Sequence, residues 1–121
     1  MKGKFQVSEA ELEVLKAIWS MEEATSSQIV EKLVNTTDWK PKTIQTLITR
    51  LVSKDAINVD KTNKKSYIYT PNISEEEYKK YANDSFLKKL YNGSVNLMIS
   101  TFIKDNKLSK EDIEDLKKML E

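Results

Sequence analysis

The sequence has 121 residues and a formal net charge of +1, a size that corresponds to one domain with at most a small appendage. It contains no Cys, no His and only two Gly, which excludes disulfides, thiolate or imidazole catalysis, Cys- or His-ligated metals and Gly-rich phosphate loops. No stretch approaches the roughly 18 apolar residues of a membrane-spanning helix, and the N-terminus lacks a secretory signal. We therefore expect a cytoplasmic protein that is not an enzyme, needs no cofactor or metal and does not insert into membranes.

Helix starts are marked by a Ser or Thr that stands three residues before an acidic or amide side chain. This spacing predicts four capping boxes, Ser8 with Glu11, Thr25 with Gln28, Ser74 with Glu77, and Ser109 with Asp112. The first box opens an amphipathic run over Glu9–Met21, and the second opens a shorter run over Ser26–Val34. These runs predict the first two helices of the chain.

A third helix is predicted from Pro41 to about Lys54, because Pro suits the first helical position and apolar residues recur at helical spacing. No acidic residue lies on its polar face. Residues 40–65 hold seven basic and two acidic residues, a net charge of +5, whereas residues 1–39 carry −3 and residues 74–121 carry −1. The positive charge is therefore local, which favours contact with a polyanion. The alternative is an ordinary solvated helix face.

A two-stranded hairpin is predicted after the third helix, with residues 57–59 and 67–69 flanking a polar, lysine-rich tip. Three helices followed by a hairpin are typical of the winged helix-turn-helix domain, whose third helix enters the DNA major groove. The predicted fold class is mainly α with a small β-wing. Residues 1–73 would form the DNA-binding domain, and residues 74–121 a three-helix dimerisation domain.

The predicted DNA contacts lie on the polar face of the third helix and at the hairpin tip. They are Lys42, Thr43, Gln45, Thr46, Thr49, Arg50, Lys61, Lys64 and Lys65. We expect Lys42, Thr43 and the tip lysines to contact phosphates, although a solvated loop is an equal alternative for the tip. The remaining four residues, Gln45, Thr46, Thr49 and Arg50, can contact base edges. Gln can bind adenine, Arg can bind guanine, and Thr can contact a thymine methyl group or donate to a hydrogen-bond acceptor. Arg50 suits a phosphate equally well, and Trp39 either covers the helical core or lines the DNA-facing edge.

The C-terminal third carries three further amphipathic runs. Without a disulfide or metal, 48 residues are too few for a robust independent core, so a second copy of the chain is the natural partner. The alternative is packing against the winged domain of the same chain. The predicted homodimer interface consists of Tyr78, Phe86, Leu90, Val95, Met98, Ile99, Phe102, Ile113, Leu116 and Leu120. A twofold dimer would present two recognition helices to double-stranded palindromic DNA.

Five stretches carry a family signature: SEAELEVLKAIW, WKPKTIQTLITRL, YIYTPNI, FLKKLYNGS and LSKEDIEDLKKML. Through them the sequence resembles the BlaI/MecI family of penicillinase and methicillin-resistance repressors over nearly its full length. The resemblance implies a winged-helix, homodimeric repressor of palindromic operators, rich in TACA/TGTA half-sites, upstream of antibiotic-resistance genes. It also implies inactivation by proteolysis in the dimerisation domain, through a pathway headed by a β-lactam-sensing membrane metalloprotease.

Two positions depart from the family pattern. The family's scissile Asn-Phe bond corresponds here to Thr101–Phe102, and Lys40 stands where relatives usually carry Ser before the Pro. Two alternatives to a resistance repressor are a repressor of an unrelated operon and a winged-helix module whose basic face binds an acidic protein partner.

Overall fold

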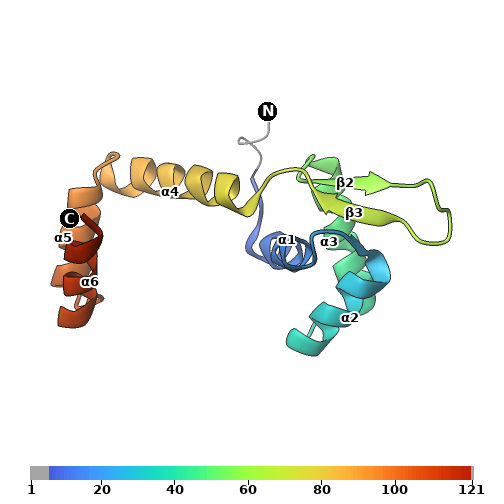
Figure 1. Ribbon diagram of the computed structural model, residues 1–121, viewed down its shortest axis with the longest axis horizontal. Helices are drawn as coiled ribbons and strands as arrows, with labels where there is room; N and C mark the ends of the chain where they lie inside the picture. Colours follow the sequence, from blue (N-terminus) through green and yellow to red (C-terminus); the bar gives the residue numbers. More distant parts are fainter. Residues whose placement is uncertain (1–5, 121) are drawn as a thin grey trace. The chain divides into compact units, whose positions relative to one another are not determined.

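The computed structural model describes residues 6–120, without the side chain of residue 120, so the predicted interface residue Leu120 lies outside the described side chains. In chain order the elements are α1 (Glu9–Met21), β1 (Ala24–Thr25), α2 (Ser26–Thr36), α3 (Pro41–Ser53), β2 (Ile57–Asp60), β3 (Ile68–Pro71), α4 (Glu75–Tyr91), α5 (Val95–Lys104) and α6 (Lys110–Leu120) (Figure 1). The predicted fold class, mainly α with a small β-wing, is confirmed. Among the described helices, none combines the length and apolar character needed to cross a membrane.

The helix starts follow the predicted caps. In all four boxes the Ser or Thr hydroxyl accepts a hydrogen bond from the amide three residues later, and that residue's side chain accepts one from the cap amide. Each box therefore satisfies two amides that a helix start leaves without partners. Ser94 opens α5 with half of the same arrangement, since its hydroxyl accepts from the amide of Leu97 at 3.0 Å.

The first three helices share one hydrophobic core. Its larger members are Val14, Leu15, Ile18, Ile29, Leu33, Ile44, Leu47, Ile48, Leu51, Ile57 and Ile73. The four apolar residues that recur at helical spacing in α3, Ile44, Leu47, Ile48 and Leu51, are among them. Burial of this side of the helix fixes its polar face toward the outside. Trp39 is partly buried and packs against the core, which confirms its interpretation as a cover.

A small antiparallel sheet closes the core, with the strand order β1-β3-β2. The predicted hairpin is present, with Asp60 of β2 opposite Ile68 of β3, and residues 61–67 form its tip (Figure 1). The third strand, β1, was not predicted. It pairs Ala24 with Tyr69 and Thr25 with Ile68, and so ties the start of α2 to the base of the hairpin.

The chain forms two compact units, Met1–Tyr81 and Ala82–Glu121, which divide inside α4. The predicted domain boundary lay earlier, after residue 73. The first turns of α4 belong to the first unit because Tyr78 packs on Trp19, with ring centroids 5.8 Å apart. The indole N–H of Trp19 also donates a 2.9 Å hydrogen bond to the carbonyl of Ile73, just before the cap of α4. Tyr78, predicted for the dimer interface, is thus partly covered within its own chain.

Candidate nucleic-acid interface

The polar face of α3 is the most basic exposed helix surface of the first unit. Its predicted contact residues, Lys42, Thr43, Gln45, Thr46, Thr49 and Arg50, are all exposed. Among the described residues, the side chains of Gln45 and Arg50 make no hydrogen bond or ion pair, so both are available to a ligand. An amide and a guanidinium on one exposed helix face supply donors and an acceptor for base edges.

The start of α3 differs from the other well-capped helix starts. Lys40 occupies the N-cap position without a side-chain hydrogen bond, and Pro41 follows at the first helical position. The first-turn amides therefore lack a side-chain partner, and the first turn contains no acidic residue to offset the positive end of the helix dipole. With the ammonium groups of Lys40 and Lys42 added, this end of α3 is suited to an anion such as a DNA phosphate.

Three hydroxyl groups on the same helix are turned back to its backbone. Thr46 donates to the carbonyl of Lys42 and Thr49 to that of Gln45, each at 3.0 Å, while Ser53 donates to the carbonyl of Arg50 at 2.8 Å. The hydroxyl of Thr43, by contrast, makes no hydrogen bond within the described structure. The three threonines of α3 therefore do not offer the same chemistry to a ligand.

The tip of the hairpin is ordered by its own polar side chains. The carboxylate of Asp60 accepts from the amide of Thr62 at 2.8 Å, and the Asn63 side chain accepts from the amide of Lys65 at 3.0 Å. Hydrogen bonds from Thr62 hold the pKa of Asp60 below its usual value, so this acid stays ionised within the basic tip. The ammonium of Lys61 lies 5.7 Å from the ring centroid of Tyr67, a cation–π distance.

The three predicted tip lysines, Lys61, Lys64 and Lys65, are exposed. The structure thus places basic side chains at the start of α3 and at the hairpin tip of the same unit. A helix flanked by such a wing is the arrangement that winged-helix proteins present to a duplex.

One basic residue of the segment 40–65 is occupied elsewhere. The ammonium of Lys54, at the end of α3, lies 2.5 Å from the carboxylate of Glu11 and also donates to the carbonyl of Gln6 at 2.8 Å. Glu11 is buried, and its carboxylate also accepts from the amide of Ser8. Sequence reasoning missed this pair, because its members are 43 residues apart and no local pattern joins them.

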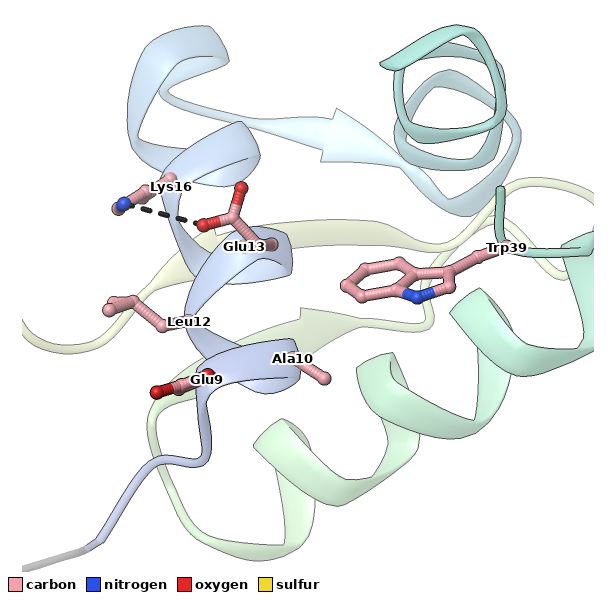
Figure 2. Close-up of a pocket in the computed structure, with 6 residues that line it drawn as sticks. All are labelled: Glu9, Ala10, Leu12, Glu13, Lys16 and Trp39. Atoms are coloured by element: carbon pink, nitrogen blue, oxygen red, sulfur yellow. Dashed lines mark hydrogen bonds and ion pairs between the residues drawn. The ribbon is translucent and has the colours of Figure 1, made fainter. Parts of the chain in front are cut away.

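An open groove of about 480 Å³ lies along α1 (Figure 2). Trp39 extends toward Ala10 at one side, and Leu12 contributes a further apolar wall. Glu13 and Lys16 at its border form an ion pair of 3.3 Å. The groove contains none of the predicted DNA contacts, and its charged lining residues, Glu9, Glu13 and Lys16, carry a net charge of −1.

The second unit exposes apolar side chains instead of burying them. Among its described residues no side chain is fully buried, and the large hydrophobic residues with the greatest exposure are Phe86, Leu90, Val95, Leu97, Ile103 and Met119. The other predicted interface residues, Met98, Ile99, Phe102, Ile113 and Leu116, are half-buried. The predicted scissile bond, Thr101–Phe102, lies inside α5, where the Thr101 hydroxyl donates to the carbonyl of Leu97 at 2.9 Å.

Comparison with known proteins gives a consistent result. A family model described as "Penicillinase repressor" matches residues 7–121. The penicillinase repressor of Bacillus licheniformis is 41% identical over 121 residues, which cover 100% of this chain and 94% of that protein. The methicillin resistance regulatory protein MecI of Staphylococcus aureus strain N315 is 36% identical over 116 residues, 96% of this chain and 94% of the relative.

Two solved structures resemble the winged part of the chain. The DNA binding domain of the repressor BlaI matches with a TM-score of 0.57 and 44% identity, covering 64% of this chain and 94% of that one. The monomeric form of Bacillus licheniformis BlaI in complex with the blaP half-operator matches with a TM-score of 0.56, at the same identity and coverage.

Proposed function

Because this chain belongs to the penicillinase repressor family, we propose that it is a transcriptional repressor that binds operator DNA through α3 and the hairpin tip. The observation that carries the proposal is the exposed, acid-free face of α3 opposite four buried residues, in the most basic segment of the chain. The solved complex of a 44% identical relative with a half-operator supports a DNA partner for the same fold.

The repressor acts as a homodimer that is joined through residues 82–121. The support is the absence of any fully buried side chain among the described residues of this unit, together with its exposed apolar residues. Covering such residues is the main driving force of protein association. Two copies related by a twofold axis would bind a palindromic operator with both recognition helices.

Repression ends when α5 is cut at Thr101–Phe102, through a protease pathway that responds to β-lactams. The bond lies in the most apolar helix of the second unit, so cleavage would separate Val95 and Met98 from Phe102 and Ile103. Loss of the dimer leaves each winged unit with a single half-site and sharply weakens operator binding. The regulated genes are antibiotic-resistance genes such as one for a β-lactamase.

Footprinting on the DNA upstream of the chain's own gene and its neighbours tests the DNA-binding role. We expect a protected palindrome, with binding that weakens steeply as salt rises. Five lysines per protomer, Lys40, Lys42 and the three at the hairpin tip, are assigned to phosphates, which gives a slope of log affinity against log salt of roughly −4.5 per half-site and about −9 for a dimer. Affinity that stays at the non-specific level for every sequence would instead favour the protein-interaction module.

Two substitutions sharpen this test. Arg50→Ala should weaken specific binding by about 1–3 kcal/mol, because the Arg50 side chain has no partner among the described residues and suits a guanine or phosphate. Lys16→Ala removes one positive charge from α1 that is not among the predicted DNA contacts, and should leave operator binding unchanged. Equal losses in the two variants would show that net charge, and not the face of α3, determines binding.

Dimerisation and cleavage need separate measurements. Light scattering of the full chain should give the mass of two copies at micromolar concentration. Exposure to the β-lactam-induced protease pathway should yield a fragment that ends at Thr101, which mass spectrometry identifies. A chain that stays intact while repression is relieved would exclude this route of inactivation.

A further inference from the structure

We infer that Thr46 and Thr49 select thymine by contact with its methyl group and do not donate hydrogen bonds to base acceptors. The inference rests on the proposed function, since it concerns the face of α3 assigned to operator DNA. It decides between the two modes of contact that a threonine side chain offers in the major groove.

The hydroxyl groups of Thr46 and Thr49 already donate hydrogen bonds within α3. A threonine hydroxyl has one hydrogen, so it donates one hydrogen bond at a time. In Thr46 and Thr49 that hydrogen is already used by the carbonyls of Lys42 and Gln45, four residues earlier, at 3.0 Å. Donation to the O6 or N7 of guanine, or to the O4 of thymine, would require breaking a bond within the helix. The hydroxyl oxygens can then only accept hydrogen bonds, and the γ-methyl groups are the parts of the two side chains that make no bond within the helix.

The spacing of Thr46 and Thr49 along α3 matches that of neighbouring bases. Thr46 and Thr49 are both exposed and lie three residues apart, so they share one face of α3. Their separation along the helix axis is about 4.5 Å. Successive bases of one DNA strand are spaced by about 3.4 Å, so the two methyl groups address neighbouring base pairs. Burial of Leu47 and Ile48 between them keeps α3 from rotating about its axis.

Thr43 provides an internal contrast. It is exposed near the start of α3, and its hydroxyl has no hydrogen-bond partner in the described structure. Its hydrogen is free for a phosphate oxygen. The two kinds of threonine should therefore respond in opposite ways to loss of the hydroxyl and to loss of the methyl group.

The test uses the full chain and the operator identified by footprinting, with each thymine replaced in turn by deoxyuridine, which lacks only the methyl group. At one or two neighbouring positions we expect affinity to fall about fourfold per methyl group, the value of one buried carbon. Thr46→Val and Thr49→Val keep a γ-methyl group and should keep the sensitivity to deoxyuridine. Thr46→Ser and Thr49→Ser should bind about fourfold less tightly and lose their sensitivity to deoxyuridine.

Thr43 serves as the matched control. Thr43→Ser keeps the hydroxyl group and should keep the affinity for DNA, whereas Thr43→Val loses the hydroxyl group and should bind all DNA sequences less tightly by the same factor. The inference is overturned if the Ser variants at positions 46 and 49 bind normally while the Val variants do not. It is also overturned if the operator is bound but no deoxyuridine substitution weakens it. Failure to find any preferred sequence would contradict the proposed function itself, and is therefore distinguishable from both.

Discussion

Replacing Lys54 with Met should destabilise the first unit more than replacing its partner Glu11 with Gln. The side chain of Glu11 is 3% exposed, whereas that of Lys54 is 35% exposed. Without Lys54 the carboxylate remains buried and keeps only its hydrogen bonds with Ser8. Removing one partner of a fully buried pair costs about 3–5 kcal/mol, and partial exposure of the ammonium lowers this to roughly 2–3 kcal/mol.

Glu11→Gln should cost only about 1 kcal/mol. The amide oxygen of Gln can still accept the hydrogen bond that completes the cap with Ser8. The ammonium of Lys54 can turn toward water, because a third of its side chain is already exposed. The asymmetry between the two variants follows from which partner is able to reach solvent.

The parent chain and Lys54→Met should also differ in how their stability depends on pH. Burial raises the pKa of Glu11, but hydrogen bonds from Lys54 and Ser8 and the charge of Lys54 lower it more, so its pKa lies below the ordinary value of 4.5. In the parent chain this carboxylate therefore stabilises the fold above about pH 4.5, and the contribution is lost as pH falls through the lowered pKa. In Lys54→Met only the hydrogen bonds from Ser8 oppose burial, so the pKa of Glu11 should be higher than in the parent chain. The deficit of that variant should shrink as pH falls from neutral toward 4.

Urea unfolding followed by tryptophan fluorescence measures these differences, since both tryptophans, Trp19 and Trp39, lie in the first unit. Lys16→Met is the control, because its ion pair with Glu13 is about half exposed and should contribute less than about 0.5 kcal/mol. Equal losses for the two lysine variants, or a deficit of Lys54→Met that grows in acid, would refute the reasoning.

Three further outcomes are expected. Lys40→Ser should raise the free energy of unfolding, measured by urea titration, by about 0.5–1 kcal/mol, because α3 lacks a side-chain cap. The same variant should make operator affinity less sensitive to salt, which a salt titration of binding measures. Ile103 is a half-exposed apolar residue of α5, and Ile103→Asp should yield monomers in light scattering while the affinity for a half-site stays unchanged. Ser100→Asp, at an exposed polar position next to Thr101, is the control and should leave the dimer intact. Gly93→Ala should cost about 1 kcal/mol in thermal unfolding, because Gly93 has a φ of 81° and an added Cβ meets no atom within 4 Å, so backbone strain alone opposes it.

Much of the fold was predictable because its signals are local. Each capping box joins residues three positions apart, and all four boxes formed as predicted. The strand β1 gave no such signal. Two residues, Ala24 and Thr25, have no periodicity of their own, and they become a strand only by pairing with β3, more than 40 residues later.

The candidate site divides in the same way. The outward face of α3 was predictable, because four buried apolar residues determine which side of a helix faces solvent. The surface against which an apolar stripe packs was less predictable. Positions 78, 82, 86 and 90 form one stripe in the sequence, yet Tyr78 packs on Trp19 in the first unit while Phe86 is exposed in the second. Helical periodicity identifies a face to be covered, but not what covers it.

The basic residues of the segment 40–65 are unevenly distributed over the proposed DNA-binding surface. Of the basic residues in the segment 40–65, Lys54 is neutralised by Glu11, and the rest gather at the start of α3, at Arg50 and at the hairpin tip. Between Lys42 and Arg50 the exposed side chains are neutral, and those of Thr46 and Thr49 present methyl groups. Under the proposed function, phosphate attraction and base selection would thus involve different residues. Substitutions at the tip should change affinity for all sequences and its salt dependence, whereas substitutions at the centre of α3 should lower affinity for the preferred sequence more than for other sequences.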